Sequence, residues 1–305
     1  MKPYETYQHL DGEMTPRNVT EQNSKFWGKG KWDNFVLPLL PNDCSELSLI
    51  DVGCNSGLFC KLAEEKGFKK VTGIDNNVDA ITKGKEYCNK NGYKYELRCE
   101  NIQDYLKSAP VVDYTILVNA HYYFPIPDWF EYVDKLKSKT RYCLIVTTKK
   151  RIKTHLASAD IHYLDKYFYD WEKLDGIDPL PTEGDPSPRL LWTRLYKSPI
   201  LERVKFEGLT NRNDQKGFYE ELDNGVPAMN TVYAKYMMRY RKEQWSDEET
   251  KEYIIGKEYL YQNIKRNGIL EPMILNRKNK VVDGSHRYII AEHLGETSGI
   301  FRRTW

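Results

Sequence analysis

The chain has 305 residues, 40% of them hydrophobic and 30% charged, and a formal net charge of +2. This length suits one large domain or two ordinary ones, and no strong polyanion-binding field follows from the nearly balanced composition alone. Six cysteines lie within residues 44–143 without a Cys-x-x-Cys pair. They predict reduced, mostly buried thiols, and no metal site is expected.

The first residues of the chain contain no apolar stretch of the kind found in a secretion signal. No run of about 18 apolar residues occurs further on, as a membrane-spanning helix would need. We therefore expect a cytoplasmic protein without membrane insertion. The sequence indicates no particular oligomeric state.

Short apolar runs alternate with helical patterns through the first half of the chain. The expected strands are residues 47–52, 70–75, 93–99, 114–120 and 142–148, and the expected helices are residues 58–67, 78–90, 102–106 and 129–136. Such alternation predicts an α/β fold with a doubly wound, mostly parallel sheet. Further on we expect an aromatic helix at 161–171, a Pro/Gly-rich loop at 174–188 and a strand at 190–196 near the antiparallel edge.

A polar, turn-rich stretch at 210–227 suggests a boundary. Beyond it the patterns predict helices at 232–241, 247–267 and 288–294 and strands at 272–276 and 280–282. The predicted organisation is a first domain over 1–205, connecting helices over 206–245, and a small α+β domain over 246–305.

A glycine-rich turn directly follows the first expected strand, as Asp51-x-Gly53-x-x-x-Gly57. Glycine lets a ligand approach the backbone, and the following helix aims N–H groups at it. Asn55 stands where a dinucleotide-binding loop would have its middle glycine. Asp75 closes the second strand, where an acidic side chain can bind ribose hydroxyls. Together these features predict a nucleoside pocket.

These motifs resemble those of the Rossmann-like, class I S-adenosylmethionine-dependent methyltransferases, over roughly residues 25–200. The resemblance implies that S-adenosylmethionine is the cofactor. It places the amino-acid end of the cofactor at the first loop, the ribose at the end of the second strand and the adenine after the third strand. The residues implied to bind it are Asp51, Gly53, Asn55, Gly57, Asp75, Asn76, Asn101, Ile102 and Asn119.

The segment after the fourth strand, Asn119-Ala120-His121, departs from the Pro-Pro box of the enzymes that methylate amino groups of DNA bases. His121 is a candidate catalytic base for a hydroxyl or carboxylate acceptor, since an imidazole titrates near neutral pH. The alternative is that this histidine only shapes the pocket.

The C-terminal segment carries Gly268-Ile269-x-x-Pro272 and then the loop 283–287, Asp-Gly-Ser-His-Arg, which opens a helix. This pattern resembles the ParB/sulfiredoxin-like fold, whose members include nucleotide-binding proteins, sulfinic-acid reductases and a small-molecule kinase. Ser285 stands where the reductases need cysteine, which argues against that chemistry.

Backbone N–H groups at a helix start, together with an arginine, can cradle a phosphate. We therefore expect Gly284, Ser285, His286 and Arg287 to bind phosphate, and Asp283 to serve as a catalytic base or magnesium ligand in a kinase-like reaction. The resemblance implies ATP, ADP or CTP with Mg²⁺ as the ligand. The alternative is an ordinary Asp-Gly turn.

The leading hypothesis is a methyltransferase acting on a small-molecule or glycan-type acceptor, with a C-terminal module that binds nucleotide or acts as a kinase. A second hypothesis is an RNA or DNA methyltransferase whose module grips the nucleic acid, which the balanced charge does not favour. A third is a non-catalytic protein that senses S-adenosylmethionine or a nucleotide.

Overall fold

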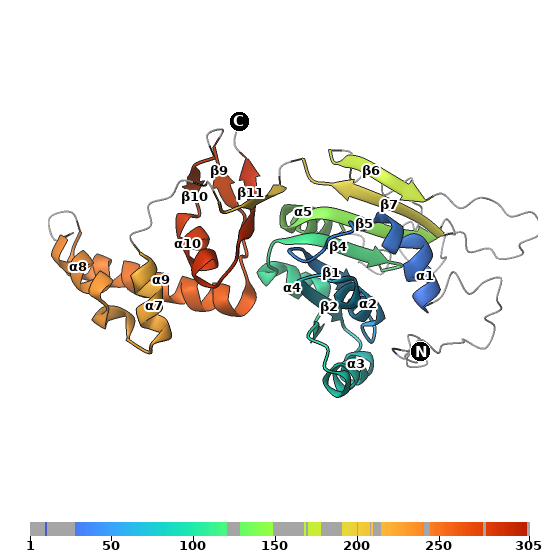
Figure 1. Cartoon of the computed structure of the whole chain (residues 1–305), viewed down its shortest axis with the longest axis horizontal. Helices are drawn as coiled ribbons and strands as arrows, with labels where there is room; N and C mark the ends of the chain where they lie inside the picture. Colours follow the sequence, from blue (N-terminus) through green and yellow to red (C-terminus); the bar gives the residue numbers. More distant parts are fainter. Residues whose placement is uncertain are drawn as a thin grey trace, which may run out of the picture. The chain divides into compact units, whose positions relative to one another are not determined.

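The computed structural model separates the chain into two compact units, residues 1–107 with 112–199, and residues 108–111 with 200–305. Figure 1 shows the helices and strands of both units. The structure describes residues 10, 28–120, 129–148, 168, 170–177, 191–199, 201–207, 209, 215–240, 245–276 and 279–303.

The first unit is built on a seven-stranded sheet in the order β3-β2-β1-β4-β5-β7-β6. The strands from β3 through β5 pair in parallel, and β7 runs antiparallel to both of its neighbours. The predicted doubly wound, mostly parallel sheet is therefore confirmed. The strands are β1 Ser48–Val52, β2 Lys70–Asp75, β3 Glu96–Cys99, β4 Val112–Val118, β5 Thr140–Thr148, β6 Glu172–Ile177 and β7 Leu191–Lys197.

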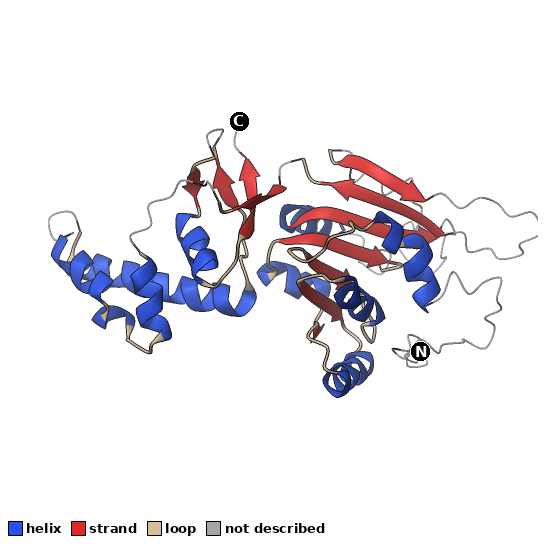
Figure 2. Ribbon diagram, viewed as in Figure 1, coloured by secondary structure: helices blue, strands red, loops and turns tan. Residues whose placement is uncertain are grey.

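Helices cover this sheet on both faces (Figure 2). The alternation of neighbouring residues on β7 separates the two cores: Leu195 packs with the apolar side chains of α1, α2 and α3, whereas Tyr196 stacks on Phe168 at 4.5 Å. Lys137 of α5 lies over the same Phe168 ring. The helices are α1 Gly28–Phe35, α2 Leu58–Lys66, α3 Val78–Asn91, α4 Ile102–Ser108 and α5 Trp129–Lys139, with a short 3₁₀ turn η2 Leu37–Leu39.

The prediction of a loop beginning at residue 174 is wrong for residues 174–177, because they belong to β6. This strand pairs with β7 at the edge of the sheet, and its first four side chains are exposed. It therefore lacks the apolar alternation that marks a buried strand. The rest of the predicted loop and most of the predicted aromatic helix lie outside the described residues.

The second unit is built on a four-stranded mixed sheet in the order β10-β9-β11-β8. Its core joins the sheet residues Met273, Leu275 and Phe301 to Tyr261 and Ile290 on helices. Its elements are β8 Leu201–Lys205, α7 Lys216–Asp223, η4 Ala228–Asn230, α8 Val232–Tyr240, α9 Asp247–Asn267, β9 Met273–Leu275, β10 Val281–Asp283, α10 Ser285–His293 and β11 Ser298–Arg303.

This division differs from the predicted boundaries at 205 and 245. Strand β8 pairs antiparallel with β11, so the second unit begins before residue 206. The stretch read as connecting helices is also part of its core, since Phe218, Tyr219 and Leu222 of α7 are buried there together with Met237 of α8. A helical apolar face within a polar segment explains the difference.

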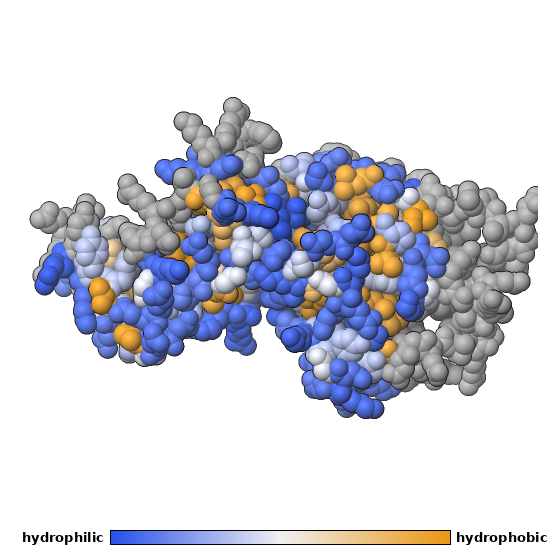
Figure 3. Space-filling view, viewed as in Figure 1, coloured by the Kyte–Doolittle hydropathy of each residue, from blue (hydrophilic) through white to orange (hydrophobic). Residues whose placement is uncertain are grey.

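The visible surface is mostly hydrophilic, with hydrophobic residues in separate patches (Figure 3). Among the described residues, no helix is both long enough and apolar enough to span a bilayer. All six cysteines are free, and five of them are buried.

Candidate functional site

The carboxyl ends of β1 and β4 meet where the strand order of the first sheet reverses. Val52 pairs with Ile74 of β2 on one side and with Leu117 of β4 on the other. The chain leaves β1 and β4 toward opposite sides of the sheet, so the region outside their carboxyl ends, here called the crevice, is a topological switch point. Ligands of open α/β sheets bind in such crevices.

The loop between β1 and α2 is held in an unusual backbone conformation. Gly53, Asn55 and Gly57 all have positive φ, of 77°, 52° and 89°. The N–H groups of Gly53 and Cys54 both donate to the Ile74 carbonyl, at 2.8 and 3.1 Å. The first turn after β1 is thus fixed to β2, while Gly53 itself stays exposed and open to a ligand.

Asp75 fixes the other side of this loop. Its carboxylate accepts the Asn55 N–H at 2.8 Å and the Asn77 N–H at 2.9 Å. The side chain is half-buried, and Asn76 beside it is exposed. Since each carboxylate oxygen can accept a second hydrogen bond, Asp75 can organise the loop and still receive ribose hydroxyls.

Two buried amide oxygens at the crevice lack a partner among the described residues: Oδ1 of Asn55 and Oδ1 of Asn119. Asn119 follows β4 directly, has φ of 55°, and is tied to β5 by its N–H, which donates to the Val146 carbonyl at 2.8 Å. A buried acceptor without a donor is unfavourable by about 1–3 kcal/mol. A ligand that brings donors to these two oxygens would remove that penalty.

Asn101 and Ile102 lie at the start of α4, next to the carboxyl ends of β2 and β3. The exposed Asn101 caps this helix, because its Oδ1 accepts the Gln103 N–H at 3.0 Å. Ile102 is half-buried, and the Glu100 N–H donates to the Asp75 carbonyl at 3.1 Å. The structure therefore brings this segment beside Asp75, as a pocket for a nucleoside requires.

Asp51 lies beneath the loop and is only 2% exposed. Its burial, and secondarily the charge of Asp75, raises the pKa of this carboxyl to about 8. Its contacts include the Cys60 thiol, 4.0 Å away. Asp51 thus supports the loop from inside, whereas Gly53 is on its exposed side. His121, the predicted base, lies outside the described residues.

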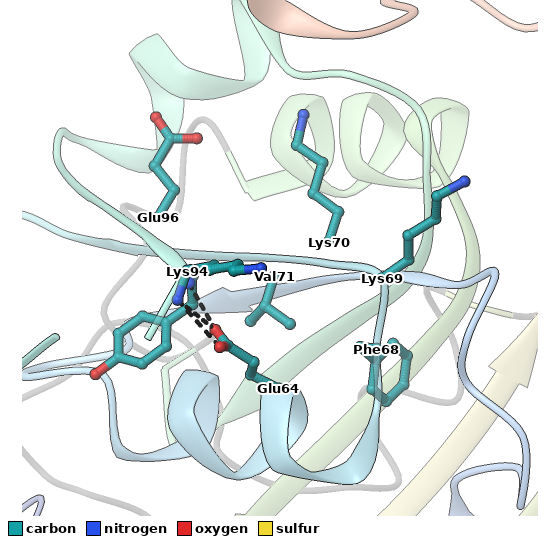
Figure 4. A pocket seen from close by; sticks show the side chains of 8 residues that line it. Glu64, Phe68, Lys69, Lys70, Val71, Lys94 and Glu96 are labelled. Carbon is teal, nitrogen blue, oxygen red and sulfur yellow. Dashed lines mark hydrogen bonds between the residues drawn. The ribbon is translucent and has the colours of Figure 1, made fainter. Parts of the chain in front are cut away.

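A surface pocket of about 270 Å³ lies elsewhere on the first unit, near the amino ends of β2 and β3. Glu64 there accepts the N–H groups of Lys94 and Tyr95, and Lys69 and Lys70 extend away from it (Figure 4). This pocket lies away from the carboxyl ends of the strands, where ligands of open α/β sheets bind. The crevice is identified instead by backbone geometry and unpartnered acceptors.

In the second unit the predicted phosphate loop is part of the regular elements. Asp283 ends β10, and Ser285, His286 and Arg287 form the first turn of α10. Gly284 has φ of 77°, and a Cβ there would lie 2.9 Å from Arg287 Nε, so any other residue would be strained and would displace the arginine side chain.

The Arg287 guanidinium is held by the protein itself. It donates to the Glu271 carbonyl at 3.0 Å, to the Pro272 carbonyl at 3.2 Å and to the Asp283 carboxylate at 3.1 Å. These bonds tie the start of α10 to the segment before β9. Arg287 therefore stabilises this fold directly, a role that the motif alone did not predict.

Sequence reasoning missed a cluster centred on Lys257 of α9. This lysine is 3% exposed, and its Nζ lies 2.9 Å from His286 Nδ1. The spacing of Tyr253 and Lys257, four residues apart on one helix, was the only sequence signal for it. Among the described residues, no group of three or more His, Cys, Asp or Glu side chains could hold a metal ion.

Residues 49–141 match the family model described as a methyltransferase domain. No match is found among curated proteins. Similar solved structures include TehB from Haemophilus influenzae, with 18% identity and a TM-score of 0.43, covering 50% of this chain and 58% of that chain. The chain thus spans less than two thirds of TehB.

Two further similar structures match this chain over more of their own length. The PH0226 protein from Pyrococcus horikoshii has 14% identity and a TM-score of 0.47, covering 63% of this chain and 95% of that one. A SAM dependent methyltransferase from Archaeoglobus fulgidus has 18% identity and a TM-score of 0.43, covering 58% and 97%. With TM-scores below 0.5, these structures say nothing about acceptor or residue roles.

The family match spans β1 through the start of β5, which includes the loop, Asp75 and Asn119. The residues that form the crevice therefore lie within the part of the chain that matches a methyltransferase domain. The predicted enzyme class, an S-adenosylmethionine-dependent methyltransferase, is confirmed for this unit.

Proposed function

We propose that the first unit binds S-adenosylmethionine in the crevice at the carboxyl ends of β1, β2 and β4 and methylates a small-molecule or glycan-type acceptor. The observation that carries the cofactor site is the pair of buried, unpartnered oxygens of Asn55 and Asn119. They fit a ligand whose amino-acid end brings hydrogen-bond donors. Asp75 fits the ribose hydroxyls, and Asn101 with Ile102 fits the edge of the adenine.

S-adenosylmethionine would supply an electrophilic methyl group on a sulfonium. The residues of this chain would supply alignment and exclusion of water, which are the main sources of rate in such a displacement. The proposed acceptor is a hydroxyl, with His121 as the base that takes its proton, or a carboxylate, which is already ionised and needs no base.

Calorimetric titration of the full chain with S-adenosylmethionine and S-adenosylhomocysteine tests the cofactor site. We expect Asp75→Ala to weaken both ligands by about 100-fold, since it removes a charged acceptor and loosens the loop. Asp79→Ala, an exposed acidic residue in the first turn of α3, is the matched control. Unchanged binding by Asp75→Ala would refute the assignment. Release of S-adenosylhomocysteine with candidate acceptors then separates an enzyme from a sensor.

We further propose that the second unit is a ParB-like module that binds a phosphate-bearing nucleotide (ATP, ADP or CTP with Mg²⁺) at residues 283–287. Support comes from the left-handed Gly284 before the first turn of α10, which directs N–H groups outward. Asp283 is the proposed catalytic or magnesium-binding side chain if the module is a kinase, and its side chain is 62% exposed.

Titration of each nucleotide into the wild type and into His286→Ala tests this second site. We expect measurable binding that falls about tenfold in the variant, which corresponds to one lost hydrogen bond to a charged group. Tyr259→Ala, a highly exposed residue of α9, is the control. If no nucleotide binds the wild type, the unit has another role.

A further inference from the structure

Helix α3 has a glycine at a buried position in its middle, where the backbone does not require one. Gly84 lies on the buried face of this helix together with Ile81 and Cys88, and its φ is not positive. Alanine would be the better helix former there, because glycine loses more chain entropy on folding. The glycine is therefore explained by space rather than by backbone conformation.

The backbone of the loop at residues 53–57 occupies the space beside Gly84. A Cβ at Gly84 would overlap the Ser56 carbonyl oxygen and would lie 2.5 Å from Leu97 Cδ1. The end of a flexible side chain can move away from such a contact, but a backbone carbonyl moves only together with its loop. The absence of a side chain at Gly84 thus lets α3 approach the backbone of Ser56 directly.

Leu97 of β3, the second neighbour of Gly84, is itself enclosed by glycines. A Cβ at Gly57 would lie 2.9 Å from its Cδ2, and a Cβ at Gly73 would lie 2.7 Å from the same atom. Leu97 is only 4% exposed, so close packing leaves it little room to turn. A side chain at position 84 would therefore press on the loop directly at Ser56 and, through Leu97, at Gly57.

The contact at Ser56 continues a row of contacts from β2 and α3 to the loop. The Ile74 carbonyl accepts the N–H groups of the first two loop residues, and the Asp75 carboxylate accepts the N–H of Asn55. Gly84 contacts Ser56, the next residue of the loop. Consecutive residues of the loop are thus positioned by one continuous segment of the chain.

The Asp75 carboxylate also ties the loop to the start of α3. It accepts the N–H of Asn55 at 2.8 Å and that of Asn77, the N-cap of α3, at 2.9 Å. The helix and the loop are joined again at Gly84, seven residues or about two turns beyond Asn77. A displacement of α3 would therefore move Ser56 and disturb the hydrogen bond between Asn55 and Asp75.

We propose that Gly84 is a positioning residue for the binding of S-adenosylmethionine. The missing side chain lets α3 hold Ser56, and through it Asn55 and Asp75, in the geometry that receives the cofactor. This inference rests on the proposed cofactor site of the first unit. Gly84 is buried, so its effect passes through the backbone of the loop.

Gly84→Ala adds one methyl group at this contact. We expect the variant to bind S-adenosylmethionine and S-adenosylhomocysteine about tenfold more weakly in calorimetric titrations of the full chain, because the loop must shift relative to Asp75. A helix glycine without this role would give a different result, since alanine would then raise the urea midpoint and leave both affinities unchanged. Unchanged affinities would overturn the proposal.

Gly256→Ala is the matched control. Gly256 lies in the middle of α9, is exposed, and a Cβ there would meet no atom within 4 Å. We expect this variant to have a higher urea midpoint than the wild type and the same affinity for both ligands. Equal loss of cofactor affinity in the two variants would refute the role of Gly84, because the loss would then not depend on the contact with Ser56.

Amide hydrogen exchange of the ligand-free protein measures the loop itself. The Asn55 N–H is bonded to Asp75, and we expect it to exchange at least about threefold faster in Gly84→Ala than in the wild type. The Cys54 N–H is the internal control, because it is bonded to the Ile74 carbonyl and should change less. Equal exchange of the Asn55 N–H in the two proteins would contradict the positioning role.

The wild type alone provides a test that does not depend on the folding of a variant. We expect saturating S-adenosylhomocysteine to slow amide exchange at residues 82–86 of α3, which flank Gly84, by at least about threefold. Residues 88–91, at the end of the same helix, should change less. Unchanged exchange at residues 82–86 would overturn the proposal.

The proposed cofactor site and the proposed role of Gly84 fail in different ways. If the wild type binds neither S-adenosylmethionine nor S-adenosylhomocysteine, the cofactor site is wrong, and the role of Gly84 falls with it. If the wild type binds both ligands and Gly84→Ala binds them equally well, the cofactor site stands and only the role of Gly84 is wrong.

Discussion

The two glycine turns of this protein have similar backbones and opposite polar chemistry. Each follows a strand, places a glycine at positive φ and opens a helix, at Gly57 before α2 and at Gly284 before α10. At the first turn, the amide oxygens of Asn55 and Asn119 are buried without a partner among the described residues. At the second, the Arg287 guanidinium bonds to two carbonyls and a carboxylate of its own unit.

The difference separates a turn with buried acceptors that lack donors among the described residues from a turn whose arginine is bonded within its own unit. Buried acceptors without donors are unfavourable, so a ligand that brings donors would stabilise the first turn. An internally satisfied arginine contributes to folding whether or not a ligand is present. A helix N-terminus is therefore informative about function only together with the bonding of its side chains.

The largest expected effect comes from removing the hydrogen bonds of Arg287 at the second turn. Arg287→Met removes hydrogen bonds from a charged donor to the Glu271 and Pro272 carbonyls, and we expect the second unit to lose about 2–3 kcal/mol of stability. Urea unfolding of the full chain, followed by circular dichroism, measures this loss. Arg239→Met, at an exposed position of α8, is the control and should change little. Unchanged stability with lost anion binding would instead make Arg287 a ligand residue.

The next effect tests the first turn. Asn55→Gly and Asn119→Gly keep the backbone N–H groups, relieve the positive φ and remove the unpartnered oxygens. We expect each to weaken S-adenosylmethionine binding about tenfold, or about 1.4 kcal/mol, with no loss of stability. Asn279→Gly, also at positive φ but in the second unit, is the matched control. Lost stability with unchanged cofactor affinity would mean that both amides serve the fold.

The buried strands of the first sheet could be predicted from the sequence, because burial on both faces leaves apolar runs closed by Gly53 or Asp75. Strands β1 to β5 accordingly lie within three residues of their expected bounds. Strands β6, β8 and β11 were missed. Strand β6 is an exposed edge, and β8 is short and pairs with β11 almost 100 residues away, so local patterning carries little information about them.

The glycines and Asp75 of the first site were predictable because a backbone conformation or a strand end demands those residue types. The lack of a hydrogen-bond donor to Asn55 Oδ1 among the described residues was not predictable, since it depends on what surrounds the side chain. The pair of Lys257 and His286 was also not predictable, because it arises only when α9 and α10 pack together. In each case the missing information is tertiary.

A smaller effect concerns the buried Asp51 carboxyl beneath the first turn. Burial raises the pKa of Asp51 to about 8, so between about pH 4 and pH 8 the folded state holds a proton that the unfolded state has released. The stability of the wild type should therefore fall as pH rises through this window. We expect the stability of Asp51→Asn to change less with pH than that of the wild type. At pH 8 the variant should be more stable than the wild type by at least about 1 kcal/mol. Thermal unfolding at several pH values, with Asp79→Asn as control, measures this.

The smallest effect has the opposite sign and comes from Asp223 in the second unit. Hydrogen bonds from Lys265 at 2.7 Å, Tyr261 at 2.5 Å and His293 at 2.8 Å hold the pKa of this carboxyl well below its usual value. Its contribution to stability is then present above about pH 4 and is lost as pH falls through the lower folded-state pKa.

Because the Asp223 side chain is about a third exposed, we expect Asp223→Asn to lower the stability of the second unit at pH 7 by only about 0.5–1 kcal/mol. The loss of stability caused by Asp223→Asn should shrink toward pH 3. The gain of stability caused by Asp51→Asn should grow toward pH 8. Glu220→Gln, exposed on the same helix as Asp223, is the control. Parallel pH slopes for the two aspartate variants would contradict the contrast between a buried carboxyl with a raised pKa in one unit and a hydrogen-bonded surface carboxylate with a lowered pKa in the other.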